Sequence, residues 1–504
     1  MGNGQRLIRG AFILTAAGLL TRLIGFFYRI FLSHAIGAEG MGIYQLIFPL
    51  NMLCYALTTA GIQMAISRFV SAKLALDDVQ EANSTFLVGT VCSFLLSCTA
   101  GWAMHHYAPF LSEKILSEPR TLPMLRLMAY SIPMGSLHTC ISGYFFARKQ
   151  TGLPAVSQLL EQAARVMSSY LVYLVMLSKG LKPTPVIAAA GMLCGELAAM
   201  VFSLAAAAWH LQAQKFSLGI VRHPGRILKD IIPLSAPVTA NRVLITLLNS
   251  LEAILIPVRL RMSGLNTTQS LSIYGTFSGM ALPLVLFPST ITNAVSVMLL
   301  PSVSEAQARG NNRAIQKTIE TTLKYCLILG IFSTGLFFCY GPRLGLYLFH
   351  SSAAGLFVRI LSFICPFLYL DVTLSSILQG LGKTGLCFIN NALGVSLRIL
   401  MVLFAVPSQG IQGYLWGLLA SELLCAALDF GALHRYSEIC LDAVSWLLKP
   451  AAALSIALGS TLFFSAFFRV LKFLPPIAVL GLEMAVCSVF YLAILVCMGI
   501  LKKE

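Results

Sequence analysis

Apolar segments long enough to cross a lipid bilayer recur along the whole chain of 504 residues, and short connections separate them. A membrane-spanning helix needs about 20 mainly apolar residues, whereas the strands of an outer-membrane barrel are shorter and alternate in polarity. With 57% hydrophobic and only 11% charged residues, the chain leaves no room for a soluble domain. The sequence therefore predicts an all-α integral membrane protein.

The apolar segments predict fourteen transmembrane helices. If successive helices cross in alternating directions, Lys and Arg residues are far more frequent on the side of the N-terminus than on the other side. Cytoplasmic loops carry such an excess, so we expect both termini to be cytoplasmic. The predicted helices cover residues 7–32, 41–66, 83–107, 122–147, 155–178, 187–211, 229–260, 271–298, 317–340, 353–379, 387–406, 411–432, 448–471 and 476–500.

The distribution of charge and cysteine excludes several classes of protein. The net charge of +16 is spread over short loops, so we expect no nucleic-acid partner. The 13 cysteines lie mostly in apolar segments without metal-ligand spacing, which indicates packing residues and no metal site. No loop has room for a nucleotide-binding or catalytic domain. We therefore expect a transporter rather than an enzyme, without a cofactor and driven by a Na⁺, H⁺ or substrate gradient.

Two stretches of the chain resemble each other at a nearly constant separation of 226 to 233 residues. Many transporters consist of two copies of one helical unit, which leave an internal repeat of this kind. Each match is short, but the series extends over six consecutive predicted helices. The matched positions include Ile43 with Ile273, Val70 with Val303, Pro133 with Pro366, Thr151 with Thr384, Arg165 with Arg398, and Glu196 with Glu422.

The repeat fixes the predicted domain organisation. Because a unit of six helices is even-numbered, both copies begin on the same side of the membrane and the repeat is parallel. Such a repeat implies a symmetry axis along the membrane normal and a cavity between two bundles. We expect an N-terminal lobe over residues 1–228, a C-terminal lobe over residues 229–447, and two additional helices with a short tail over residues 448–504.

Charged residues inside the predicted helices are the candidate functional residues, because a charge within a membrane must face a partner or a cavity. Arg22 and Arg29 lie seven residues apart on one helix face. Arg242 and Glu252 share the proline-containing seventh helix, and an offset of 230 aligns Arg22 with Glu252. The three arginines suit a diphosphate, because a guanidinium makes bidentate hydrogen bonds with phosphate oxygens. Glu252 is a candidate for a switchable partner or a coupling site.

Five further charges suit either a structural or a coupling role. Glu196 and Glu422 each follow a glycine and a second small residue about one helical turn apart, a spacing that indicates close helix packing. Arg165 and Arg398 recur with them and are candidates to neutralise their charge. Asp371 is a lone carboxylate, and an ion or proton site is as compatible with it as a structural role.

Four stretches of the chain resemble one family of membrane proteins. The stretches are TRLIGFFYRIFLSHAIGAEGMGIYQLIFP (21–49), AGIQMAISRFVS (60–71), SQLLEQAARV (157–166) and LLPSVSEAQARGN (299–311). They are similar to stage V sporulation protein B and its relatives, which are polysaccharide-biosynthesis proteins of the multidrug/oligosaccharidyl-lipid/polysaccharide flippase superfamily. The resemblance covers nearly the whole chain and is more specific for the family than for a substrate.

This resemblance implies two six-helix lobes, a V-shaped central cavity, and alternating access that moves an undecaprenyl-linked saccharide across the bacterial plasma membrane. The related lipid II flippases carry a helix-one arginine in a setting similar to that of Arg22. Their next arginine corresponds to Tyr28, one residue before Arg29, and their helix-eight arginine has no counterpart near Tyr274. The phosphate-binding set is therefore not carried over intact, and Arg242 is the candidate for the missing cation.

The sequence as a whole favours a flippase for a lipid-linked saccharide that serves cell wall or spore cortex synthesis. Membrane lipids and cell-wall synthesis proteins are its expected partners. One alternative is an ion-coupled multidrug exporter of the same superfamily, although three intramembrane arginines and two extra helices argue against it. Another alternative is a non-transporting scaffold in wall or spore assembly, in which the intramembrane charges are purely structural.

Overall fold

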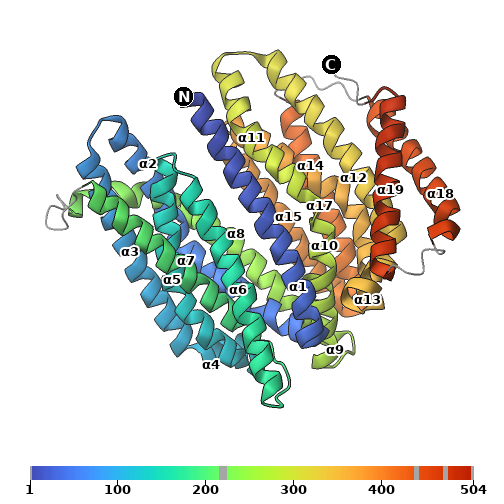
Figure 1. Ribbon diagram of the computed structural model, residues 1–504, viewed down its shortest axis with the longest axis horizontal. Coiled ribbons are helices and arrows are strands. Elements are labelled where there is room, and N and C mark those ends of the chain that lie inside the picture. Colours follow the sequence, from blue (N-terminus) through green and yellow to red (C-terminus); the bar gives the residue numbers. More distant parts are fainter. Residues whose placement is uncertain (1–2, 215–223, 436–441, 469–474, 501–504) are drawn as a thin grey trace. The chain divides into compact units, whose positions relative to one another are not determined.

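The computed structural model describes residues 3–214, 224–435, 442–468 and 475–500, and these residues form helices without any strand (Figure 1). Their contacts divide the chain into two compact units. The first unit comprises Met1–Val258 with Thr267–Gly275, and the second comprises Arg259–Asn266 with Thr276–Glu504. The predicted all-α class is confirmed, while the lobe boundaries at residues 228 and 447 stay predictions.

The described residues contain nine helices that are long and apolar enough to cross a membrane. The number is ten if Thr267–Leu286 and Ser289–Ala308, which meet at a bend of 59°, count as one span. A multi-pass membrane protein is therefore confirmed. The finding does not establish the predicted number of fourteen membrane spans, which remains a prediction.

The first unit is a bundle in which α3, α5, α7 and α6 pack side by side in that order (Figure 1). The sequence predicts separate helices over 7–32 and 41–66, and α1 consists of two helical stretches that meet at a kink at Gly37, whose φ of 68° is not helical. The helices of this unit are α1 (Asn3–Tyr55), α2 (Gly61–Ala75), α3 (Val79–His106), α4 (Ala108–Phe110), α5 (Leu122–Ala147), α6 (Gly152–Ser178), α7 (Val186–Ala213), α8 (Pro224–Met262, ending in the second unit) and α9 (Thr267–Gly275).

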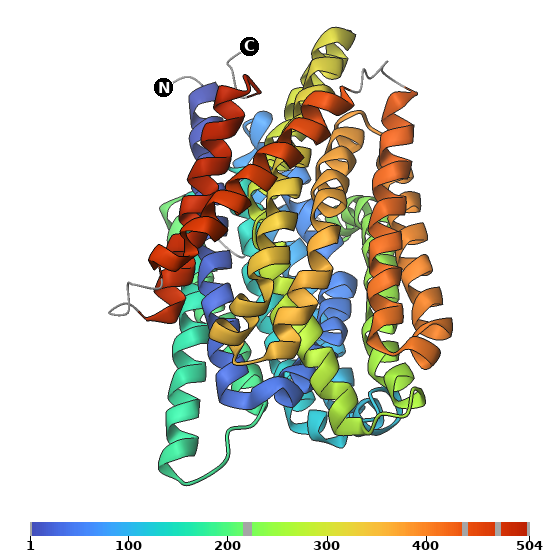
Figure 2. The ribbon, with the colours of Figure 1, turned by 90° about the vertical axis from the view of Figure 1, so that its right-hand side faces the viewer.

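The second unit contains the remaining helices, and α18 and α19 pack against each other and against α12 (Figure 2). The predicted helix over 353–379 is interrupted, since a 3₁₀ turn at Ser362–Ile364 separates α13 from α14. The helices are α10 (Leu282–Leu286), α11 (Ser289–Ala308), α12 (Asn312–Phe349), α13 (Ser352–Leu361), α14 (Cys365–Gly380), α15 (Thr384–Phe404), α16 (Val406–Gln409), α17 (Ile411–His434), α18 (Lys449–Phe468) and α19 (Pro476–Cys497).

Helix contacts inside the first unit recur inside the second at the offsets of the sequence repeat. The hydroxyls of Ser157 on α6 and Ser203 on α7 are hydrogen-bonded at 3.0 Å. At the matching positions, Asn390 on α15 donates a hydrogen bond of 2.7 Å to Asp429 on α17. This agreement is what a duplicated unit predicts. Two further contacts recur in the same way. Gly101 closely approaches Ala129, and the matching residues Thr334 and Ser362 are hydrogen-bonded. Gly143 closely approaches Gln63, and the matching residues Ser376 and Ser296 are hydrogen-bonded.

An ion pair joins α19 to α12, with Nη1 of Arg343 at 2.8 Å from Oε2 of Glu483. The carboxylate is buried, but the Arg343 side chain is 42% exposed. We therefore expect Glu483→Gln to lower the free energy of unfolding by about 1–2 kcal/mol, less than the loss of a fully buried pair. Chemical denaturation in detergent measures this change. Glu305→Gln, which breaks an exposed pair with Arg309, is the control, and an equal loss in both variants would contradict the prediction.

Candidate functional site

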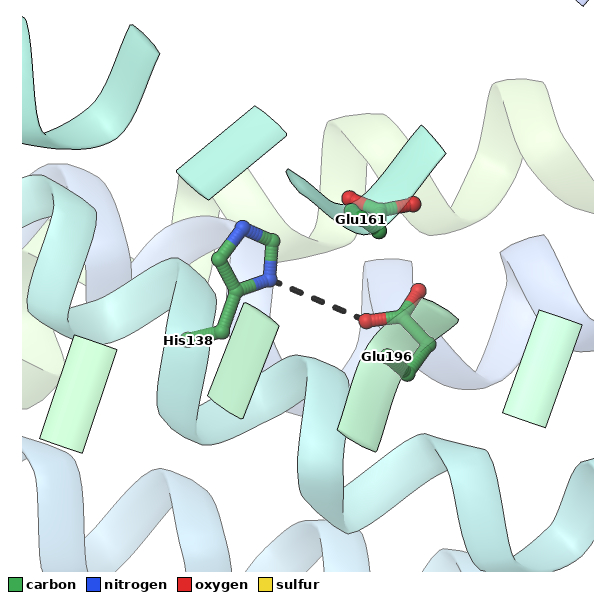
Figure 3. Close-up of side chains that lie close together, drawn as sticks. All are labelled: His138, Glu161 and Glu196. Atoms are coloured by element: carbon green, nitrogen blue, oxygen red, sulfur yellow. Dashed lines mark ion pairs between the residues drawn. The ribbon is translucent and has the colours of Figure 1, made fainter. Parts of the chain in front are cut away.

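Four ionisable side chains from three helices meet inside the first unit. His138 lies on α5, Glu161 and Arg165 lie on α6, and Glu196 lies on α7. Nδ1 of His138 is 3.7 Å from Oε2 of Glu196, and Figure 3 shows both side chains beside Glu161. Ligand atoms of His138, Glu161 and Glu196 all lie within 4.8 Å of one another, and we name these three residues the His–Glu–Glu cluster. Arg165 donates a hydrogen bond from Nη2 to Oε1 of Glu161.

Helix geometry brings these groups together. Glu161 and Arg165 are four residues apart, so they share one face of α6. Two glycines on α7 face that helix, and they allow its backbone to approach closely. A Cβ atom added at Gly195 would lie 2.8 Å from the carbonyl oxygen of Glu161, and one at Gly191 would lie 2.9 Å from that of Arg165. The close approach places Glu196 next to the charged face of α6.

Gly195→Ala should therefore destabilise the first unit, because the added methyl group has to push α6 and α7 apart. We expect a loss of about 1–3 kcal/mol, the usual range for an overpacked site. Gly431→Ala on α17 is the matched control, since a Cβ there meets nothing within 4 Å. The thermal unfolding midpoints of the two variants in detergent test the prediction, which fails if Gly195→Ala is as stable as the control.

Helix α1 carries polar groups to the edge of this cluster. The hydroxyls of Tyr28 and Ser169 are hydrogen-bonded at 2.8 Å, which ties α1 to α6. Arg29, the neighbour of Tyr28, is half-buried and interacts electrostatically with Arg165 and Tyr44. Two of the sequence-predicted cations, Arg29 and Arg165, therefore lie close together in the first unit.

A cavity of about 320 Å³ in the first unit contains two more of the predicted residues, Glu196 and Arg242. Glu196 contributes a buried carboxylate, whereas the Arg242 side chain is exposed. Tyr55 and Gln63 add polar groups to the wall, and Tyr55 donates a hydrogen bond of 3.1 Å to the carbonyl oxygen of Ser131. The full lining consists of Met52, Tyr55, Ala56, Thr59, Ala60, Gln63, Thr139, Glu196, Arg242 and Thr246.

The other two predicted binding residues lie elsewhere in the first unit. Arg22 is exposed on α1, and Glu252 is buried on α8 with 6% of its surface accessible. Neither is among the residues that line the 320 Å³ cavity. The cavity therefore brings together Arg242 and Glu196 rather than the aligned residues Arg22 and Glu252.

The second unit holds a related polar cluster. Nη1 of Arg398 on α15 lies 3.3 Å from Oε1 of Glu422 on α17, as expected for a cation that neutralises this carboxylate. Asp371 on α14 interacts electrostatically with Glu422, Asp429 and Arg398. Asp429 accepts a hydrogen bond from Asn390. The three predicted charges of the second unit thus form one network, whereas the sequence presents Asp371 as a lone carboxylate.

His138 and Glu161 are the residues of the first cluster that sequence reasoning did not select. A signal for His138 is present in the repeat, because His138 precedes Asp371 by the same 233 residues that separate Arg165 from Arg398. Glu161 has no signal in the repeat, because Gly394 stands at its matching position. Its position inside the predicted helix over 155–178 is a signal, since a charge within the membrane must face a partner or a cavity.

Comparisons with known proteins agree with this architecture. The family described as Polysaccharide biosynthesis protein matches residues 7–307. Stage V sporulation protein B of Bacillus subtilis is 26% identical over 89% of this chain and 87% of its own length, and the lipid II flippase MurJ of the same organism is 22% identical over 79% and 77%. A solved structure of lipid II flippase MurJ in an inward closed conformation has a TM-score of 0.71 at 13% identity, covering 96% of this chain and 98% of that one. The chain therefore belongs to the polysaccharide biosynthesis protein family.

Proposed function

We propose that the protein is a flippase that moves an undecaprenyl-diphosphate-linked saccharide across the bacterial plasma membrane by alternating access, for cell wall or spore cortex synthesis. Both relatives named above support this assignment, since one is a lipid II flippase and the other a sporulation protein. The lipid II flippase is a transporter rather than an enzyme, which supports a transport role for this chain.

The observation that carries the proposal is the set of arginines within the helices of the first unit. Arg242 lines a cavity, Arg22 is exposed on α1, and Arg29 lies half-buried beside Arg165. A guanidinium is the side chain best suited to a diphosphate, because its planar donors form charge-assisted bonds to two phosphate oxygens at once. In this proposal Arg22, Arg29 and Arg242 bind the diphosphate, and Glu252 acts as a switchable partner or coupling site.

A groove in the second unit suits the lipid tail of such a substrate. It has a volume of about 930 Å³, and its wall is almost entirely apolar. Helix α19 contributes Ser488, Tyr491 and Leu492 to this wall, so in this proposal the last helix helps to bind an apolar chain. We name it the tail groove; the other lining residues are Ile291, Thr292, Val295, Leu299, Ala314, Lys317, Thr318, Thr321, Thr322, Tyr325, Cys326, Ile328, Leu329 and Phe332.

Transport needs an energy source, and a Na⁺ or H⁺ gradient is the proposed one. Besides Glu252, the network of Asp371, Arg398 and Glu422 is a candidate coupling site, because it gathers carboxylates around a single guanidinium on α15. A ligand that binds one transport state better than the other shifts the equilibrium between them. Occupation of such a site by a cation would supply this difference in affinity.

A flipping assay in proteoliposomes tests the proposed function. Purified protein is reconstituted with a fluorescent undecaprenyl-diphosphate saccharide, and transport is followed for the wild type beside folded Arg22→Ala and Glu252→Gln. We expect transport by the wild type and transport slowed by at least about tenfold in Arg22→Ala. Export of a cationic dye down an ion gradient, without movement of lipid-linked substrates, would assign the protein as a multidrug exporter. Inactivity in both assays would favour a scaffold.

A further inference from the structure

We propose that the His–Glu–Glu cluster binds one divalent transition-metal ion of the Zn²⁺, Mn²⁺ or Co²⁺ class. The cluster lies entirely within the first unit, on α5, α6 and α7. Sequence spacing predicts no metal site, because the three ligands are 23 and 35 residues apart and form no metal-binding motif. Helix packing assembles the ligand set, and the proposal stands apart from the identity of the transported substrate.

Two buried atoms of the cluster point to a missing ligand. Oε2 of Glu196 and Nδ1 of His138 face each other at 3.7 Å, which is too long for a hydrogen bond, and neither has a hydrogen-bond partner within the part of the chain that the structure describes. The Glu196 side chain is only 9% exposed, and its Oε2 faces the imidazole (Figure 3). Leaving buried polar atoms unsatisfied is costly, above all for a carboxylate. A cation held between these atoms would satisfy both of them at once.

The donor atoms select the class of ion. Na⁺, Mg²⁺ and Ca²⁺ prefer oxygen ligands, whereas Zn²⁺, Mn²⁺ and Co²⁺ also accept an imidazole nitrogen. Imidazole nitrogens and carboxylate oxygens both occur in zinc sites with three protein ligands, and such sites leave a coordination position open for water. Two carboxylates also supply two negative charges, which balance the charge of a divalent ion.

Arg165 orients the Glu161 carboxylate but is hydrogen-bonded to only one of its two oxygens. Its hydrogen bond engages Oε1 of Glu161, so the second oxygen of that carboxylate is left to coordinate the ion. Partners of this kind commonly fix the direction of metal ligands. The positive charge of Arg165 also repels a bound cation, so we expect moderate affinity. Glu196 and Thr139, the residue that follows His138, line the 320 Å³ cavity, which gives an ion a route to the cluster.

Metal titration of the purified full-length protein in detergent tests the site. The protein carries an affinity tag without histidine and is first treated with a chelator. Co²⁺ is then added and followed by its visible absorption, and Zn²⁺ is added in a calorimeter. We expect one saturable site per chain. We also expect Glu196→Gln and His138→Gln to weaken binding by at least about tenfold, since even outer partners of metal ligands change affinity by that factor.

An exposed carboxylate provides the control. Glu305→Gln alters a residue of the second unit that pairs with Arg309 at the surface, and it should leave the metal affinity unchanged. Size-exclusion chromatography and the unfolding temperature identify variants that fail to fold. If one ligand variant does not fold, the other still decides the question.

No saturable binding by the wild type, or the same affinity in folded Glu196→Gln and in the wild type, would overturn the proposal. Stability that depends on pH through His138 without metal binding would overturn it as well, and would indicate a protonated His138–Glu196 ion pair.

Discussion

Replacing Arg22 or Arg242 with alanine should slow the flipping of an undecaprenyl-diphosphate saccharide by about ten- to a hundredfold for each residue. A hydrogen bond to a charged group contributes about 1.5–3 kcal/mol, and each 1.4 kcal/mol changes an equilibrium constant by about tenfold. Both side chains are exposed, so alanine should leave the fold intact. Initial flipping rates in proteoliposomes, normalised to the amount of inserted protein, measure the effect.

The corresponding lysine variants separate charge from geometry. Arg22→Lys and Arg242→Lys keep the positive charge but lose the planar fork of donors, so we expect rates between those of the wild type and the alanine variants. Arg309→Ala is the control, because Arg309 directly follows α11, is exposed and pairs with Glu305 on that helix. Wild-type rates in both Arg22→Ala and Arg242→Ala would contradict the diphosphate assignment. Equal rates in the lysine and alanine variants would instead show that the donor geometry is essential.

Filling the tail groove should block substrates with a long lipid tail and spare those with a short one. Val295 lines the groove on α11 and is 40% exposed, so Val295→Trp should extend a large ring into it. We expect the flipping of an undecaprenyl-linked substrate to fall by at least about tenfold, equivalent to 1.4 kcal/mol of lost interaction with the tail. A farnesyl-linked analogue should be transported at nearly the wild-type rate, because its shorter tail needs less of the groove.

The control for this prediction lies on the same helix. Val297 is two residues further along α11 and 62% exposed, but it does not line the tail groove. Val297→Trp adds the same side chain and should leave transport of both substrates unchanged. If Val295→Trp slows the two substrates equally, the defect concerns the protein as a whole. If it slows neither of them, the tail binds elsewhere.

The sequence repeat predicts some of the contacts between helices. The offset that matches Arg165 with Arg398 also matches Ser157 with Asn390, and the offset that matches Glu196 with Glu422 also matches Ser203 with Asp429. The two pairs so related are both hydrogen-bonded, Ser157 to Ser203 and Asn390 to Asp429. A repeated sequence folds into repeated packing, so contacts in one unit predict contacts in the other. The chemistry at the matched positions nevertheless differs, since two hydroxyls in the first unit correspond to an amide and a carboxylate in the second.

The sequence by itself determined the helical class, the membrane location and the charges that a cavity or a partner must satisfy. Those properties follow from local hydropathy and from the repeat, which are independent of how the helices pack. Only the tertiary structure decided that Glu196 lies beside His138 and Glu161, because that contact depends on the approach of α7 to α6 at Gly195. It also decided that Arg242 shares a cavity with Glu196, whereas the alignment of the repeats matches Arg22 with Glu252. Residues distant in the chain become neighbours through helix packing, and no local pattern records which helices meet.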